Sequence, residues 1–315
     1  MNSTASYRII EYAPKYDVFL EDLDKRSLQG RRIQLELVRD HFLSRAIVFE
    51  DYRACILLDK SGMPAGAGAS AIVPMLLDGR TYRAGFGFDL KVLPEFRHLH
   101  LASHFAAYTL ENHFKPGGCT LYFLTSKKSN EEIMRHILTP LFPVFRYDFV
   151  YLTLPTGRPL KPARKQGNPQ RFFVELLSNA GGLQPYYEIT DSGLGIWYLD
   201  KCYRLRIRYI HPLLHLLTRA GGWLKKQWSE IIPRVGGEMR MAALYNLTAD
   251  RLPSVEACLP RLAAQGIQYL LVCCQRNDVV YHFLHPSSIN TYDYNIMGSE
   301  NFADHATLTM DVRCL

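Results

Sequence analysis

One short segment, Phe88 to Ala102, combines the residue types and spacing most suited to ligand binding; it reads FDLKVLPEFRHLHLA. A strand that ends near Val92 and a helix that begins near Leu101 would place free backbone N–H groups and a helix N-terminus at the mouth of the strand. Such a place binds phosphate through its donors and the positive end of the helix dipole. Pro94 lacks an N–H group and interrupts strand pairing, which favours divergence of neighbouring strands. The exposed edge then suits an extended ligand that adds like another strand.

The surrounding sequence predicts a mixed α/β domain over residues 1–155. Three strands are expected just before the segment, with a Gly62 turn and an Asp78-Gly79 hairpin turn between them. In the third of them, Phe86, Phe88, Leu90 and Val92 are expected on one face, with Arg83, Asp89 and Lys91 on the other. The expected strands are Tyr7–Glu11, Arg53–Asp59, Gly66–Met75, Tyr82–Leu93, Cys119–Thr125 and Val144–Leu154, and the expected helices are Val18–Leu28, Ile33–Phe42, Leu101–Phe114 and one that starts near Asn130.

Residues 156–171 are rich in Pro, Gly and basic residues and predict a linker, either a solvated connector or a polybasic tether for anions. Residues 172–315 predict a second α/β domain. Helices are expected at Phe172–Leu177, Pro212–Ile232 and Ser254–Gln265, and strands at Tyr186–Ile196, Tyr203–Tyr209, Met239–Leu247, Ile267–Cys274 and Thr307–Cys314. The helix–Gly–strand–Asn unit of residues 254–277 repeats the order of the unit at residues 101–130.

The N-terminal half resembles the GNAT superfamily of acyl-CoA N-acyltransferases. That family has a strand ending V-x-P, then Arg/Gln-x-x-Gly-x-Gly/Ala and a helix, then a second strand and an Asn that opens the next helix. This chain has Val92-Leu93-Pro94, Arg97-His98-Leu99-His100-Leu101-Ala102, the strand Cys119–Thr125 and Asn130 in the same order and spacing. The resemblance covers about residues 7–154. It implies a GNAT-like fold, with a second, degenerate GNAT-like domain as the interpretation of the C-terminal half.

The resemblance also implies functional roles. Acyl transfer from acetyl-CoA or another acyl-CoA would go directly to an amine, with Asp89 as the best local candidate for the base. An ion pair of Asp89 with Arg83 or Lys91 is the alternative. The implied cofactor-binding residues are Leu90, Val92, Arg97, His98, Leu99, His100, Leu101, Ala102 and Asn130. Among them, a backbone N–H near Val92 would polarise the thioester carbonyl, and the N–H groups from His98 to Ala102 would hold the pyrophosphate. Arg97 would order the loop or pair with a phosphate.

Two positions depart from the family pattern. His100 stands where the loop glycine lets the pyrophosphate approach the backbone, so it either crowds the site or itself contacts phosphate. Many GNAT enzymes place a Tyr about seven residues after the Asn, to protonate the leaving thiolate, and here that position is Ile137. These departures keep a non-catalytic GNAT-like binding module open as an alternative.

Composition limits the other classes of function. Hydrophobic residues make up 48% of the 315 residues and aromatic residues 12%, so a disordered chain is excluded. No stretch approaches the roughly 18 consecutive apolar residues of a membrane span. The seven cysteines form no C-x-x-C motif, which favours a reduced, cytoplasmic protein, and no metal site is expected.

The net charge of +7 favours anionic partners only weakly. The basic strand face of Arg204, Arg206 and Arg208 is either an anion site or a surface paired with acids, and the Pro212–Ile232 helix either packs on its own domain or lies on a membrane surface. We expect neither nucleic-acid binding nor stable membrane insertion. The expected function is N-acylation of a small-molecule amine, most simply acetylation, with transfer of a longer acyl chain to an amino acid as a related alternative.

Overall fold

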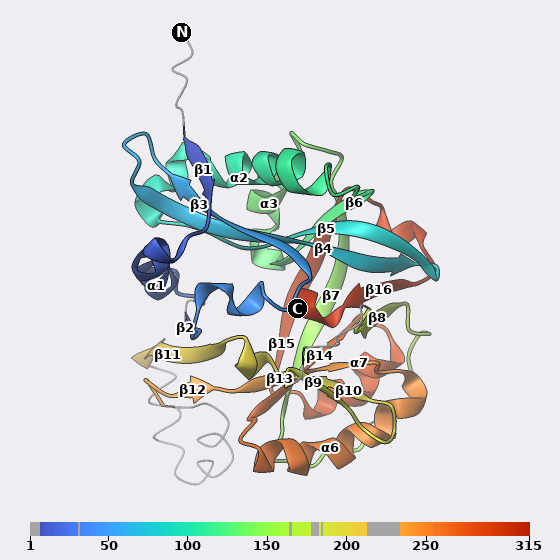
Figure 1. Ribbon diagram of the computed structural model, residues 1–315. Helices are drawn as coiled ribbons and strands as arrows, with labels where there is room; N and C mark the ends of the chain where they lie inside the picture. The colour runs from blue at the N-terminus through green and yellow to red at the C-terminus, as the bar shows by residue number, and fades with distance from the viewer. Residues whose placement is uncertain (1–6, 31, 164–165, 178–182, 184, 213–233) are drawn as a thin grey trace.

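A computed structural model describes residues 7–30, 32–163, 166–177, 183, 185–212 and 234–315. Thirteen of its strands form one mixed sheet in the order β1-β3-β4-β5-β6-β15-β7-β14-β13-β10-β9, with β16 pairing both β4 and β8 (Figure 1). These strands are β1 (Arg8–Glu11), β3 (Asp51–Leu58), β4 (Pro64–Leu77), β5 (Arg80–Val92), β6 (Leu121–Lys127), β7 (Phe145–Pro155), β8 (Phe172–Glu175), β9 (Tyr187–Ile189), β10 (Gly195–Trp197), β13 (Met241–Tyr245), β14 (Tyr269–Cys274), β15 (Asn290–Gly298) and β16 (Leu308–Asp311).

A second, three-stranded sheet has the order β12-β11-β2. Its strands are β12 (Glu238–Met239), β11 (Arg204–Ile210) and β2 (Ile33–Val38). The α-helices are α1 (Asp17–Arg26), α2 (Leu101–Thr109), α3 (Glu131–Leu138), α6 (Leu252–Ala264) and α7 (Val279–Leu284). A π-helical turn, Leu110–Phe114, extends α2.

The two halves repeat one topological unit and exchange their last strands. In the first half, parallel strands β5 and β6 are joined through α2, and α3 leads to β7. In the second, parallel strands β13 and β14 are joined through α6, and α7 leads to β15. However, β7 pairs with β14, and β15 pairs with β6. The repeated order expected from residues 101–130 and 254–277 is therefore present, and the halves share one continuous sheet.

The largest apolar cluster lies on one face of this sheet and draws on both halves. It includes Phe86, Phe123, Phe149, Trp197 and Tyr245, each at most 4% exposed. Helices α2 and α3 cover the other face of the first half, and α6 and α7 pack on the second half (Figure 1). Strand β5, which carries the start of the expected ligand segment, thus lies between the central apolar cluster and the helices α2 and α3.

Two predicted helices are wrong. Residues 33–38, expected to be part of a helix, form β2, because IQLELV also alternates and pairs with β11 from the other half. Residues 172–175 form β8, in which Phe172 and Val174 are buried and the strand runs parallel to β16. In both segments, pairing with a distant strand determines the secondary structure, since such short apolar runs fit both the helical and the strand period. Most of the expected helix Pro212–Ile232, residues 213–233, lies outside the described residues.

A bulge in β5 changes the side-chain alternation expected there. The pairing register shifts where Ala69 lies opposite Phe88 but Ala67 lies opposite Lys91. Within the bulge, Asp89 adopts a left-handed backbone with φ 52°. As a result, Phe86 and Phe88 join the central cluster, whereas Leu90 and Val92 pack on the α2 side. The expectation that these four residues share one face is therefore wrong, because a bulge inserts one extra residue and inverts the faces beyond it.

Candidate functional site

An opening between β5 and β6 lies at the place that the sequence indicated. The two strands pair only from Ala84–Leu121 to Gly87–Leu124. Strand β5 then continues to Val92 and β6 to Lys127 with no described strand between them. Opposite the bulge, Gly68 lets the ring of Phe105 in α2 approach closely, since a Cβ there would lie 2.6 Å from that ring. The bulge and the close approach of Phe105 to Gly68 hold β5 in place. An open strand edge of this kind is typical of a site that accepts an extended ligand.

Backbone donors gather at the start of α2, next to this opening. A 3-10 helix, Pro94–Leu99, follows β5, and His100 then takes a left-handed backbone with φ 54°. No hydrogen bond between described residues uses the N–H of His100, Leu101 or Ala102. Free N–H groups at the N-terminus of a helix form an anion site. His100 thus adopts the backbone conformation that favours glycine.

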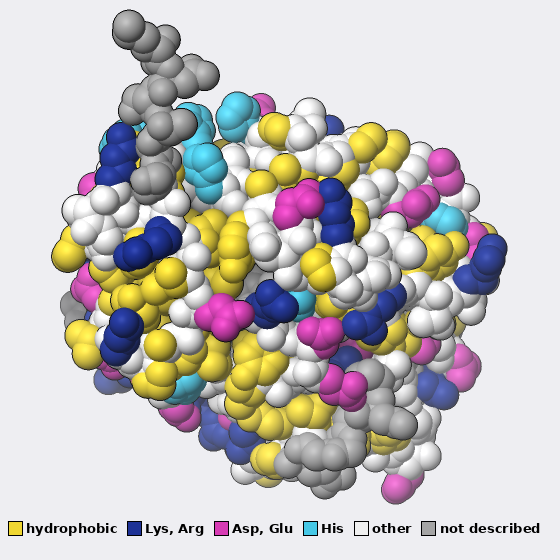
Figure 2. Space-filling model, turned by 45° about the horizontal axis from the view of Figure 1, so that its top comes forward, with side chains coloured by type: hydrophobic (Ala, Val, Ile, Leu, Met, Phe, Trp, Pro, Cys, Tyr) yellow, Lys and Arg dark blue, Asp and Glu magenta, His cyan; other side chains and the backbone are white. Residues whose placement is uncertain are grey.

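The other predicted binding residues surround this loop. Arg97 is exposed, and its Nε donates to the carbonyl oxygen of Val92 at 3.3 Å, which ties the loop to β5. Leu90, Val92 and Leu99 are partly buried and pack against the apolar cluster that includes Leu101. His98 and Asn130 are exposed. The ring of His100 lies 6.1 Å, between centroids, from that of His136 in α3, and Figure 2, which looks onto the α2 side, shows histidines grouped there.

Asp89 lies at the centre of a buried network of charges. Its Oδ2 accepts from Arg39 Nη1 at 2.6 Å and its Oδ1 from Arg45 Nη1 at 3.1 Å. Arg39 also binds Asp24 with two nitrogens, and Lys91 contacts the same Asp24. Burial alone would raise the pKa of the Asp89 carboxyl, but Arg39 and Arg45 outweigh it and hold that pKa well below its ordinary value. The carboxylate therefore stays charged. Its direct ion pairs are with Arg39 and Arg45 and not with Arg83; Lys91 pairs with Asp24 and acts on Asp89 only through its charge.

Sequence reasoning missed Arg39 and Arg45, which bind Asp89, and Lys127 at the end of β6. Arg39 and Arg45 lie near each other in sequence but about fifty residues before Asp89, and only the tertiary fold brings them together. Lys127 belongs to the open segment of β6, where its Nζ donates to Gln29 Oε1 at 3.0 Å. Burial lowers the pKa of Lys127, because its charged form loses water and its partner is neutral. A lysine at a strand end after an apolar run is the only sequence signal for it.

The second half contains a corresponding opening, but the chain itself occupies it. Strands β13 and β14 pair only from Met241 to Ala243 on the β13 side. Residues 167–175 cross the ends of these strands: Asn168 bridges to Asp278 at the start of α7, and Val174 accepts from the N–H of Asn246 at 2.8 Å. In addition, α6 has Pro253 as its second residue, where α2 has Ala102, so one backbone donor is missing.

The remaining candidates have structural roles. The basic face of β11 is paired with acids: Arg204 with Asp40, Arg206 with Glu238 and Arg208 with Glu36. Of the two interpretations of this face, the surface paired with acids is therefore the one that the structure has. All seven cysteines are buried, and burial raises the pKa of Cys273 and Cys274. On the face in Figure 2, basic and acidic side chains are intermixed.

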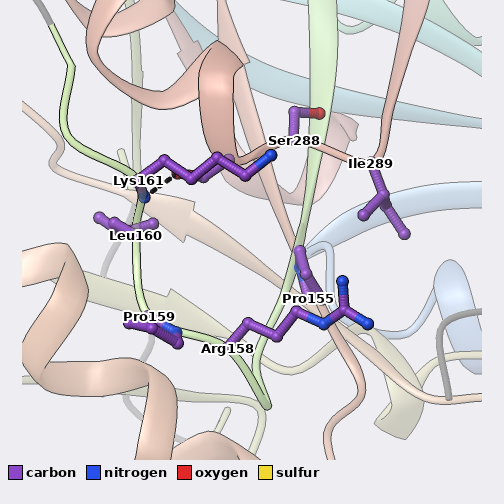
Figure 3. A pocket seen from close by; sticks show the side chains of 8 residues that line it. Pro155, Arg158, Pro159, Leu160, Lys161, Ser288 and Ile289 are labelled. Carbon is purple, nitrogen blue, oxygen red and sulfur yellow. Dashed lines mark hydrogen bonds between the residues drawn. The ribbon is translucent and has the colours of Figure 1, made fainter. Parts of the chain in front are cut away.

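A small cavity of about 60 Å³ lies where the linker meets the second half (Figure 3). It is lined by Pro155, Arg158, Pro159, Leu160, Lys161, Ser287, Ser288 and Ile289. The backbone N–H of Lys161 donates to Ser287 Oγ at 2.7 Å, so this part of the linker is fixed to the domain. The volume is well below the roughly 300 Å³ at which small-molecule sites begin.

Within the described ranges, no helix has both the length and the apolar character that a membrane crossing needs. No group of three or more His, Cys, Asp or Glu side chains in the same ranges is arranged to hold a metal ion.

No protein-family description matches the chain by sequence, and no curated protein does. Solved structures do match. Two structures of Saccharomyces cerevisiae N-myristoyltransferase with bound myristoyl-CoA match with TM-scores of 0.53; at 9% and 8% identity they cover 95% and 98% of this chain and 80% and 90% of their own. A fungal multi-domain GH3 β-N-acetylglucosaminidase with a GCN5-related glucosamine N-acetyltransferase region also matches (TM-score 0.53, 10% identity, 94% of this chain), and this chain spans only 38% of it. The chain therefore has the GNAT fold.

Proposed function

We propose that the protein is an acyl-CoA-dependent N-acyltransferase that uses the opening between β5 and β6. The observation that carries this proposal is the coincidence of the open strand edge with three free N–H groups at His100, Leu101 and Ala102. The pyrophosphate of the acyl-CoA would bind these N–H groups, and its extended arm would lie along the open edge of β5. The myristoyl-CoA bound in the structural neighbours supports an acyl-CoA as the ligand.

The left-handed backbone of His100 supports a functional loop despite the missing glycine. His is among the residues that enter this region more readily than most. Because the His100 side chain is exposed, we place it beside the phosphates and not beneath them. Arg97 orders the loop through its bond to Val92, and Asn130 at the start of α3 borders the other side of the site.

The reaction is direct transfer. The amine nitrogen attacks the thioester carbonyl, an amide bond forms, and the carbon–sulfur bond breaks to release CoA. A backbone N–H of the open β5 segment near Val92 polarises the carbonyl oxygen. The amine loses one proton, and the leaving sulfur takes one up.

We assign the proton transfer to Lys127, because it ends β6 beside the segment that β5 leaves unpaired and burial lowers its pKa. Asp89 was the base that the sequence indicated. We now assign it a positioning role, because a carboxylate held by two guanidinium groups has little affinity for a proton. Ile137 is buried against Leu138 and Met297, so this position of α3 supplies no acid.

We further propose a small-molecule amine as the acceptor and acetyl-CoA as the simplest donor, in the cytoplasm. A longer acyl chain is the alternative donor. The GNAT-like binding module without catalysis is the second candidate, and Ile137 in place of a Tyr favours it.

A thermal-shift titration with acetyl-CoA, long-chain acyl-CoA and free CoA tests the proposal. Binding to the native state raises the melting temperature by mass action, and the order of the shifts indicates acyl length. Ala102→Pro provides the matched variant, because it removes one of the three donors at a position where α6 carries Pro253. A shift that Ala102→Pro reduces supports the site. No shift with any of the three ligands contradicts it, and binding without thioester consumption across an amine panel favours the binding module.

A further inference from the structure

One glycine of β5 faces open space on the α2 side of the sheet. Gly68 in β4 also faces α2, and a Cβ there would lie 2.6 Å from the ring of Phe105. Gly85 in β5 is covered in the same way by the ring of Phe114, at 2.4 Å. At Gly87, no atom of the described chain other than its sequence neighbours lies within 4 Å of the position that a Cβ would take. The two rings thus leave the space over Gly87 empty.

This space lies at the closed end of the opening between β5 and β6. Gly87 and Leu124 form the last pair of the two strands before the strands separate. Gly87 is partly exposed, and Leu90 and Val92, beyond the bulge, face the same side of the sheet. The open edge of β5 therefore leads to the space over Gly87.

The groups that border this space are mostly apolar. Leu124 belongs to an apolar cluster with Ala106 of α2 and Met134 of α3, and all three side chains are only partly buried. The two helices lie over the same face of the sheet (Figure 1). On the β4 side, the partner of Gly87 is Ser70, which is 2% exposed and whose hydroxyl is already hydrogen-bonded. The space is therefore suited to a hydrocarbon chain, which gains free energy when apolar surface leaves water.

The direction of the proposed acyl-CoA site decides which part of the ligand reaches this space. The pyrophosphate would bind at the start of α2, and the thioester carbonyl would lie near Val92. The acyl group is the end of the ligand farthest from the pyrophosphate, so it would continue along β5 toward Gly87. Residues 87–92 span at most about 16 Å, at about 3.3 Å per residue in a strand. An acetyl group covers only a small part of this distance, whereas a longer acyl chain covers it.

We infer that the space over Gly87 holds the acyl chain of the donor, and that the donor is an acyl-CoA with a medium or long chain and not acetyl-CoA. Gly87 is then a residue that determines acyl length, because a side chain at this position would occupy the path of the chain. This inference rests on the proposed acyl transfer and names the donor class of that reaction.

Isothermal titration calorimetry with free CoA, acetyl-CoA, butyryl-CoA and octanoyl-CoA tests the inference, and it needs no acceptor amine. In the parent protein, affinity should rise with chain length, by up to about fourfold per buried methylene. Gly87→Val fills the space, so the affinity for octanoyl-CoA should fall by about tenfold or more, whereas that for free CoA and acetyl-CoA should change by less than about twofold.

The Gly87→Val protein should fold, because Gly87 lies outside the positive-φ positions of the described chain and a β-branched residue suits a strand. Its melting temperature should equal or exceed that of the parent protein, since glycine within a strand is destabilising. Ala106→Leu narrows the same space from α2 and should cause the same loss of octanoyl-CoA affinity. Gly157→Val is the matched control, because this exposed glycine also faces open space but follows β7, away from the opening.

The outcomes separate the inference from the proposed function. Equal affinities of the parent protein for acetyl-CoA and octanoyl-CoA overturn the inference, and so does a chain-length preference that both Gly87→Val and Ala106→Leu retain. Loss of free CoA binding in the folded Gly87→Val protein also overturns it, because the space would then hold the arm of the ligand and not the acyl chain. If Gly87→Val does not fold, Ala106→Leu decides. Each of these results leaves the proposed function standing, whereas no binding of any of the four ligands removes the proposed function itself.

Discussion

Arg39 Nη1 lies 2.6 Å from Oδ2 of Asp89 and joins the loop after β2 to the bulge in β5. Arg45 binds the second oxygen of the same carboxylate, and its Nη2 donates to the backbone oxygen of Leu315 at 2.6 Å. Asp89 therefore connects three separate parts of the chain beside the opening. A residue in this position fixes the shape of the site, which explains why a carboxylate occupies a strained, left-handed position in a strand.

Replacing Asp89 should reduce stability in a pH-dependent way. Asp89→Asn leaves two arginines facing a neutral amide, so we expect the free energy of unfolding to fall by about 3 kcal/mol or more at pH 7. Because the pKa of Asp89 is depressed in the folded state, its contribution is present above the unfolded pKa of about 4 and is lost as pH falls through the folded value. Urea unfolding between pH 2 and 7 should show a shallower acid loss in the variant.

The exposed Asp22→Asn serves as the control for Asp89, since its ion pair with Arg26 lies on the surface of α1 and should contribute at most about 1 kcal/mol. An Asp89→Asn protein as stable as the parent at every pH would contradict the positioning role. A folded variant that loses only the acid limb of its rate profile would restore Asp89 as the base.

His100→Gly should stabilise the loop slightly and keep acyl-CoA binding. A left-handed backbone costs an ordinary L-residue about 1–2 kcal/mol, and glycine removes that cost while adding unfolded-state entropy. We expect a net gain within about 1 kcal/mol. His98→Gly, two residues earlier and outside the positive-φ positions of the described chain, should instead destabilise the protein. Thermal denaturation of both variants measures these changes in stability. A destabilised His100→Gly protein would show that the exposed His100 side chain makes stabilising contacts.

Lys127→Met should remove a limb of the pH–rate profile. In the parent protein the rate should rise with pH as Lys127 loses its proton, at a pH below the ordinary lysine value because burial lowers its pKa. Acyl-CoA affinity should stay within a few-fold. Lys128→Met provides the neighbouring control, because that side chain is half exposed and pairs with Asp148 on the surface. Identical profiles for both variants and the parent would exclude Lys127 from proton transfer.

Each chain should bind a single molecule of acyl-CoA. Residues 167–175 occupy the second opening, and Pro253 removes a donor from the start of α6. Isothermal titration calorimetry with CoA should give one site per chain, and Ala102→Pro should weaken that site strongly. A second site, or full binding by the variant, would show that the second half also accepts CoA.

The local parts of the site were predictable because they are contiguous in sequence. The strand, proline, loop and helix from Phe88 to Ala102 carry their own turn and capping signals, and the structure places them as expected. The bulge at Asp89 was not predictable, since its register depends on Gly68 of β4 and on Phe105. The role of Arg39 was not predictable, because the segment before it also fits a helical period and becomes a strand only through pairing with β11, more than 160 residues later.

The exchanged strands also set an order of assembly. One edge of β6 stays unpaired until residues 290–298 are made, and β7 stays unpaired with β14 until residues 269–274 are made. During synthesis the first half would therefore be complete long before β14 and β15. Its unpaired strand edges could then associate with other chains. A fragment released before residues 290–298 are made would therefore keep the edge of β6 unpaired and be prone to aggregation.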